Sequence, residues 1–382
     1  MKKRKLFLLF FMSLLAVLAG VYGERTFRSI LLLSELLNFD RPGWLGRFSR
    51  PPMIKEVSWE GPQGITQADL YLPSPEEKRG GLLLNHGVID TGKDDPRLKR
   101  LATVLCQAGF AVIVPEFRGM KSFRISPSDV DEILTAFSHF RSRPEVRSDS
   151  CGLFGFSYGA GPTLIAACRP GVRDKVRFVV SFGGYYDLKN VLSFLATGNF
   201  EFQGKRYFRK PQEYGKWVFL ANNLDWVESP EDRAVLGKIL KLKLRDENAP
   251  IDSFISQLGT EGRNVLNLLS HADPSQTDAF IQKLPPAIRS TLAELSVSPG
   301  LKHLRAHLIL AHGEDDDLIP FTETLRLAQA APQSGRIYVK ILKTFSHIDP
   351  EKKPLSPESL LFFYLPEGWK LFTLTFRLLG YR

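Results

Sequence analysis

The segment of this chain best suited to chemistry is Gly-Phe-Ser-Tyr-Gly at residues 155–159, which lies between an apolar run from Cys151 and a helical pattern from Ala160. A G-x-S-x-G motif supplies a nucleophile only on a sharp turn between a strand and a helix, where glycines relieve crowding. Such a turn would expose the Ser157 hydroxyl and direct the Tyr158 N–H to the same point. The pentapeptide alone would also suit an ordinary loop, so its partners elsewhere in the chain decide its meaning.

An activated serine needs a base and an acid that orients the base. Of the seven histidines, only His347 lies in a loop just past the last predicted strand, and we expect it to be the base. The acid candidates follow the preceding predicted strand, where Asp316 is our choice and Asp315 and Asp317 are close neighbours that could be confused with it. Asp187 is a weaker alternative, and one of the three adjacent aspartates is expected to cap the next helix.

The elements that must position these residues alternate between strand and helix. Residues 56–59 and 68–72 predict an antiparallel pair, and the apolar run 81–85 is typical of a buried parallel strand. Alternation of this kind predicts βαβ crossovers and a mostly parallel sheet. Further strands are expected at residues 111–114, 151–156, 178–182, 307–310 and 337–342.

The alternation stops over residues 187–300, where the pattern is helical throughout and predicts no strand. An insertion at this point of a parallel sheet would form a lid over Ser157. Seven aromatic residues would allow an apolar pocket there, although most of them suit the core of the lid itself. These are Phe194, Phe200, Phe202, Phe208, Trp217, Phe219 and Trp226.

The order Ser157, Asp316, His347 along the chain resembles that of the α/β-hydrolase superfamily. Residues 85–88 (Asn-His-Gly-Val) and residues 312–320, which fit H-G-x-x-D-x-x-[VI]-P, resemble two further motifs of that family. The resemblance covers residues 56–347 and implies a mostly parallel sheet flanked by helices, with an all-helical cap inserted after the sixth strand.

In domain terms, the resemblance implies a core from residues 55–186 and 301–350 and a cap from residues 187–300. It also implies that the N–H of Val88 joins that of Tyr158 in an oxyanion hole.

The function that the resemblance implies is that of a serine esterase or lipase-like enzyme acting on a small-molecule acyl ester, with lipophilic acyl esters as a narrower case. The same triad would also serve a peptidase, a thioesterase or an acyltransferase. A third reading is a non-catalytic, membrane-associated binding module that keeps the fold. The expected mechanism calls for no metal and no organic cofactor.

Both ends of the chain suggest a membrane. Residues 1–23 combine a basic start with an uncharged apolar run and predict either a cleaved export signal or an uncleaved anchor, followed by a linker over residues 24–54. The positive start favours a body on the extracytoplasmic side. The tail, residues 351–382, suits either a helix at a membrane surface or a helix packed on the sheet.

The composition by itself excludes few classes of protein. With 43% hydrophobic and 24% charged residues the chain is ordinary for a globular protein, and its net charge of +10 is spread out rather than gathered into a nucleic-acid motif. Cys106, Cys151 and Cys168 show no metal-ligand spacing and are expected to be buried thiols. The sequence does not predict an oligomeric state.

Overall fold

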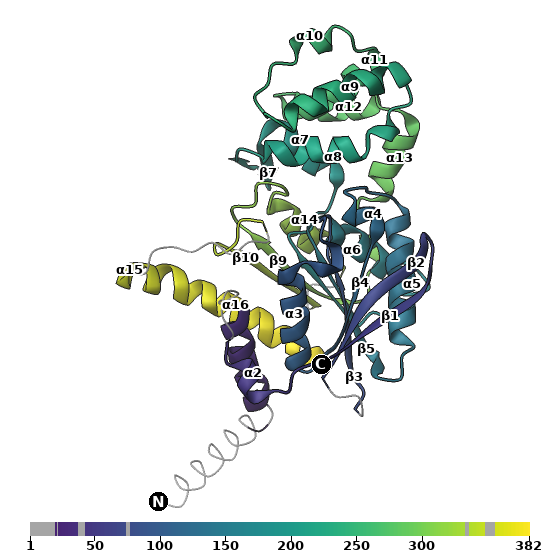
Figure 1. The fold of residues 1–382 in the computed structure, drawn as a ribbon. Coiled ribbons are helices and arrows are strands. Elements are labelled where there is room, and N and C mark those ends of the chain that lie inside the picture. The colour runs from purple at the N-terminus through teal and green to yellow at the C-terminus, as the bar shows by residue number, and fades with distance from the viewer. Residues whose placement is uncertain (1–19, 21, 37–42, 74–76, 333–335, 348–355) are drawn as a thin grey trace, which may run out of the picture.

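The computed structural model describes the whole chain except residues 1–19, 21, 37–42, 74–76, 333–335 and 348–355 (Figure 1). The predicted leader, residues 1–23, therefore lies almost entirely outside the described residues. Among the residues that are described, no helix is both long enough and apolar enough to cross a bilayer.

An eight-stranded sheet forms the centre of the molecule, in the order β1-β2-β4-β3-β5-β6-β9-β10 (Figure 1). β1 and β2 form an antiparallel hairpin, β2 is antiparallel to β4, and all other neighbours are parallel. This arrangement confirms the predicted fold class. The strands are β1 (Met53–Gly61), β2 (Gly64–Leu72), β3 (Arg79–Asn85), β4 (Ala111–Pro115), β5 (Val146–Phe156), β6 (Phe178–Phe182), β9 (His307–Gly313) and β10 (Ile337–Leu342).

Two apolar layers cover the two faces of the sheet because successive strand residues point to opposite sides. Leu83 and Leu153 belong to a cluster shared with α5, α6 and α14, whereas Leu82 and Phe154 belong to a cluster shared with α3 and the end of α16. The three cysteines are buried and free, as expected. The flanking helices are α3 (Pro96–Gln107), α5 (Ser128–Arg141), α6 (Ala160–Cys168), α14 (Thr322–Ala330) and α16 (Leu365–Leu378).

The prediction of a linker over residues 24–54 was wrong. Residues 22–36 are helical, α2 (Leu45–Phe48) follows, and β1 already begins at Met53. Leu32 is fully buried in the cluster that includes α3, so its burial stabilises this helix on the core. The buried Glu35 carboxylate adds polar contacts: it accepts the N–H groups of Gly43 and Leu45 at 2.9 and 3.0 Å and a bond from Arg100 at 2.9 Å.

The cap is not all-helical, because residues 199–208 form the hairpin β7 (Asn199–Phe202) and β8 (Lys205–Phe208). Gln203 and Gly204 both have positive φ, at 51° and 78°, which is the backbone of a type I′ hairpin turn. The paired rings of Phe200 and Tyr207 stack across the strands with centroids 5.1 Å apart. Cross-strand aromatic pairs stabilise a hairpin.

The rest of the cap is helical and lies above one end of the sheet (Figure 1). Asn223 fastens it to the core: its side chain donates to the Phe123 carbonyl at 2.9 Å and accepts the Ile125 N–H at 3.2 Å. The cap helices are α7 (Leu188–Thr197), α8 (Glu213–Asn222), α9 (Pro230–Lys243), α10 (Asp252–Ile255), α11 (Thr260–Ser270), α12 (Thr277–Gln282) and α13 (Pro286–Glu294).

The C-terminal tail forms α15 (Pro357–Ser359), a π-helical turn over Leu360–Tyr364, and α16. Leu371 and Leu378 on α16 are buried against the sheet side of the molecule. The sequence left two alternatives for the tail, a helix at a membrane surface and a helix packed on the sheet. The face of α16 that carries Leu371 and Leu378 fits the second alternative.

We predict that Glu35→Ala lowers the free energy of unfolding by about 3 kcal/mol, because buried donors lose their shared acceptor. Glu24→Ala, on the same helix but with solvent-accessible ion pairs to Arg28 and Arg382, serves as the control and should change the free energy of unfolding by less than about 1 kcal/mol. Urea unfolding of the full chain measures both values. Equal, small effects would show that residues 22–36 do not contribute to the folded core.

Candidate active site

Ser157 stands at a strained turn between β5 and α6. Its φ is 51°, a left-handed conformation that is uncommon for a residue with a side chain. A Cβ on Gly155 would lie 2.6 Å from the Ala160 Cα, and a Cβ on Gly159 would lie 2.8 Å from the Gly87 Cα. Only glycine fits at both positions, so the turn has the close approach that the sequence motif predicts.

The structure brings the three predicted residues together. His347 Nε2 lies 2.8 Å from Ser157 Oγ, and His347 Nδ1 lies 2.6 Å from Asp316 Oδ2. Since the ionised carboxylate can only accept, Nδ1–H donates to Asp316 and leaves Nε2 to accept the serine proton. This is the arrangement that a general base beside a nucleophile requires.

Asp316 is held in place by more than the histidine. Its Oδ1 accepts the N–H groups of Leu318 and Ile319 at 2.9 and 2.8 Å, and its side chain is fully buried. Burial by itself would raise the pKa of this carboxyl group. The neighbouring His347 and His312 outweigh that effect and hold the pKa below its ordinary value, so Asp316 is ionised at neutral pH.

His312 is a supporting residue that the sequence reasoning missed. Its Nε2 lies 3.2 Å from Asp316 Oδ2 and 2.9 Å from the Ile319 carbonyl, which requires a proton on Nε2. Its Nδ1 accepts from the Thr324 hydroxyl at 2.7 Å. The available signal was a histidine that ends an apolar strand in the motif at residues 312–320.

The loop after β3 lies against the serine turn and is pinned to it by Asn85. The Asn85 amide donates to the Gly159 carbonyl at 3.1 Å and to Thr163 Oγ1 at 3.2 Å, while its oxygen accepts the Gly87 N–H at 3.1 Å. Gly87 has a φ of 73°, and a Cβ there would lie 2.6 Å from the Phe156 carbonyl oxygen. The sequence analysis named Asn85 only as part of a motif and gave it no role.

His86 fixes the peptide that carries the Val88 N–H. Its Nε2 accepts the Phe117 N–H at 3.1 Å, so its Nδ1 carries the proton and donates to the Gly87 carbonyl at 2.7 Å. In a trans peptide the C=O and N–H point in opposite directions, and the bond therefore directs the Val88 N–H away from His86. Burial lowers the pKa of His86 to about 4, which keeps the ring neutral.

Tyr158, whose N–H is the other predicted oxyanion donor, is anchored by its side chain. Its hydroxyl donates to Asp129 Oδ2 at 2.8 Å, and the same oxygen accepts the Ser126 N–H at 3.0 Å. Burial raises the pKa of Asp129 to about 6. This contact ties the first residue after the nucleophile to α5 and limits movement of its backbone.

The rival carboxylates have other partners. Asp187 caps α7 by accepting the Lys189 N–H at 3.0 Å, and Asp315 forms an ion pair with Arg209 of the cap. The Asp317 carbonyl accepts the Gln212 N–H at 3.0 Å. Residues 315 and 317 therefore fasten the cap to the loop that carries Asp316.

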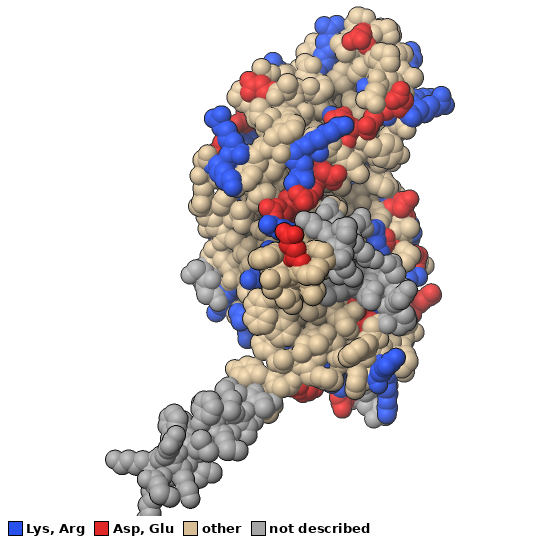
Figure 2. Space-filling model, turned by 90° about the vertical axis from the view of Figure 1, so that its left-hand side faces the viewer, with Lys and Arg blue, Asp and Glu red and all other residues tan. Residues whose placement is uncertain are grey.

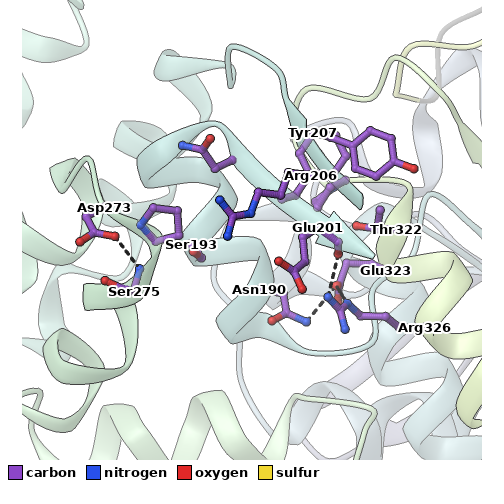
Figure 3. A pocket seen from close by; sticks show the side chains of 14 residues that line it. Asn190, Ser193, Glu201, Arg206, Tyr207, Asp273, Ser275, Thr322, Glu323 and Arg326 are labelled. Atoms are coloured by element: carbon purple, nitrogen blue, oxygen red, sulfur yellow. Dashed lines mark hydrogen bonds and ion pairs between the residues drawn. The ribbon is translucent and has the colours of Figure 1, made fainter. Parts of the chain in front are cut away.

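A separate polar cavity of about 510 Å³ lies between the hairpin β7–β8, α7 and α14 (Figure 3). Glu323 in its wall accepts from the Tyr186 and Asp187 N–H groups and the Asn190 amide, at 2.9 to 3.0 Å. These bonds hold the start of the cap on α14. Neither Ser157 nor His347 lines this cavity.

The mostly parallel eight-stranded sheet flanked by helices is the arrangement that the resemblance to the α/β-hydrolase superfamily implies. Among solved structures, the chain is similar to an acylaminoacyl peptidase of Pyrococcus horikoshii (12% identity, TM-score 0.49, 88% of this chain and 42% of that one). It is also similar to a puromycin-hydrolyzing peptidase of Mycobacterium tuberculosis (16%, 0.49, 86% and 38%) and to a dienelactone hydrolase of Anabaena variabilis (14%, 0.44, 85% and 96%).

Comparisons by sequence give less information about this chain. No family model matches the chain. A Mycobacterium tuberculosis protein with the provisional name phosphoribosyl transferase is 32% identical over 157 residues, which are 40% of this chain and 34% of that protein. The chain thus spans about a third of the length of this relative, and the activity in its name does not transfer to this chain.

We predict that Asn85→Ala lowers kcat about ten- to a hundredfold, because the loop after β3, which carries the predicted donor Val88, loses its bond to the turn at Ser157. The same change should lower the free energy of unfolding by about 2 kcal/mol, since it leaves buried backbone groups without partners. Asn264→Ala on α11 of the cap, where the half-buried amide donates to the Lys283 carbonyl at 3.2 Å, is the control. Lost stability with an unchanged kcat would mean that Asn85 supports the fold and not the loop.

Proposed function

We propose that this protein is a serine hydrolase that cleaves carboxylic esters through an acyl-enzyme intermediate. The relay Ser157, His347, Asp316, with its contacts of 2.8 and 2.6 Å, is the observation that supports the proposal. The strained backbone of Ser157 adds to it, because such strain is concentrated at functional sites.

In the proposed mechanism, Ser157 Oγ attacks the ester carbonyl while His347 Nε2 takes its proton. The N–H groups of Val88 and Tyr158 stabilise the oxyanion, and His347 then gives the proton to the leaving alcohol. A water molecule then attacks the acyl-enzyme in the same way, with His347 again taking and returning the proton. This step releases the acid and free Ser157. Asp316 remains ionised throughout and stabilises the imidazolium.

A lipophilic acyl group is supported by two cavities that share Phe156, the residue before Ser157. The first, about 80 Å³, is lined by His86, Asp95 and Arg97 as well as by the apolar residues Ile89, Leu98, Leu101 and Phe156. The second, about 130 Å³, shares Leu101 and Phe156 and runs between the sheet, α3 and α16. The second cavity is lined by apolar side chains apart from Thr375, and cavities of this kind stay dry and take up apolar molecules. We propose that the acyl chain of the substrate enters this pair of cavities.

The function is tested with p-nitrophenyl esters, matched p-nitroanilides and thioesters. We expect ester turnover that falls at least about 10⁴-fold in Ser157→Ala and does not change in Ser138→Ala, an exposed serine on α5.

Faster cleavage of anilides or thioesters would replace the esterase assignment with a peptidase or thioesterase. Transfer of the acyl group to an added alcohol in preference to water would indicate an acyltransferase. Equal and negligible rates in the wild type and in Ser157→Ala would favour a non-catalytic binding module.

The acyl-chain cavity is tested at Leu101, which lines both spaces. Leu101→Phe should lower kcat/KM for a decanoyl ester at least tenfold and leave an acetyl ester within about twofold, since a methylene in an apolar pocket contributes about 1 kcal/mol. Leu134→Phe, a half-buried leucine on the opposite face of the sheet, is the control. Equal losses for both esters would place the acyl chain elsewhere.

A further inference from the structure

We propose that the outward face of α16 is a docking surface for a lipid bilayer. Leu365, Trp369, Phe372 and Phe376 define this face, which we call the outer stripe. The inference rests on the shape and packing of the chain ends and does not depend on the proposed catalytic function.

The outer stripe is continuous along the helix. Its members are spaced by four, three and four residues, which places them on one side of an α-helix. The Trp369 and Phe372 rings lie 5.3 Å apart and the Phe372 and Phe376 rings 5.9 Å apart. Leu365 is 58% exposed and Trp369 64% exposed, and the preceding turn adds Phe362 at 74%. Phe372 and Phe376 are half-buried, so the exposed part of this surface is formed by Phe362, Leu365 and Trp369. An exposed apolar patch of this kind marks an interaction site.

Packing on the opposite side prevents α16 from rotating to bury the stripe. Leu371 and Leu378 are buried on that side. The buried Glu367 carboxylate accepts the Lys343 N–H at 2.8 Å and a bond from Lys370 at 2.6 Å. Lys370 also donates to the Ile341 carbonyl at 2.8 Å. Because these contacts fix the helix on β10, the stripe must face outward.

The other end of the chain reaches the same surface. Tyr22 lies beside Phe376, with ring centroids 6.3 Å apart, and the Arg25 guanidinium lies 4.0 Å from the centre of the Phe376 ring. Residues 6–22 form an uncharged apolar sequence after a basic start. A bilayer is the environment that such a sequence favours. We propose on the same ground that the body lies on the extracytoplasmic side.

The surroundings of the stripe suit a flat partner. The end of α15 and the start of α16 stand away from the body (Figure 1), so the stripe projects and does not line a groove. Figure 2 looks onto this side and shows a lower area that is mostly free of Lys, Arg, Asp and Glu. The helix 22–36 and α2 add further exposed apolar side chains. These are Phe27, Ile30, Trp44 and Phe48.

The inference is tested by fluorescence quenching with the full-length chain and phosphatidylcholine vesicles whose acyl chains carry bromine. We expect quenching of tryptophan emission that persists in 1 M salt, because apolar contact is not screened. Trp369→Phe should remove at least half of this quenching. Quenching that is the same in wild type and Trp369→Phe would show that the stripe does not enter the bilayer.

A second comparison of variants distinguishes insertion of the outer stripe from nonspecific adsorption of the protein to vesicles. Leu365→Ser with Phe372→Ser should lower the quenching of Trp369 at least threefold. Phe208→Ser, at a residue that is 71% exposed on the cap hairpin, should leave it unchanged. Equal effects of both would overturn the proposal. If the protein forms a dimer without vesicles, and the dimer dissociates in the double variant, the proposal is also overturned. The stripe would then bind a second copy of this chain and not a bilayer. Should the double variant fail to fold, the Trp369→Phe comparison still decides.

Discussion

The contact of 2.6 Å between His347 and Asp316 depends on the register of two parallel strands. In β9 and β10, Ile341 pairs with His312 and Leu342 with Gly313, so the loops after both strands leave the sheet at the same edge. β5 ends at that edge as well and presents Ser157. A shift of one residue would turn every side chain of a strand to the other face and separate the three groups. The geometry of the site is therefore a consequence of the pairing of the sheet.

Buried polar contacts around the site keep that geometry from relaxing. Asn85 holds the loop after β3 against the turn at Ser157, His86 fixes the peptide between Gly87 and Val88, and His312 contacts the Asp316 carboxylate. Each of these side chains is buried, so its hydrogen bonds compete with little water. The proposed mechanism requires donors that are already oriented toward the developing charge, and these contacts fix the backbone that carries the proposed donors.

Much of the fold and the site could be predicted because the signals are local. Glycine spacing at residues 155–159, a histidine after the last strand and an aspartate after the preceding strand are all short patterns, and parallel strands bring their carboxyl ends together. The strands themselves were recognisable from apolar runs. The identity of the nucleophile, base and acid remains a prediction that the geometry supports.

What could not be predicted depends on neighbours distant in sequence. The helix 22–36 is stabilised by burial of Leu32 and by the bond between Glu35 and Arg100, which no local pattern contains. The β7–β8 hairpin has only four residues in each strand, and its Gln-Gly turn is a weak signal within a helical segment. The role of His312 likewise depends on Thr324 and Asp316, which come close to it only in the folded chain.

The central claim, that Ser157 is an activated nucleophile, is tested most directly by mass spectrometry after reaction with a fluorophosphonate. We predict one adduct per chain, located on the peptide that contains Ser157, with labelling that is strongly slowed in His347→Ala. No adduct, an adduct on another residue, or labelling at an equal rate in His347→Ala would contradict the account.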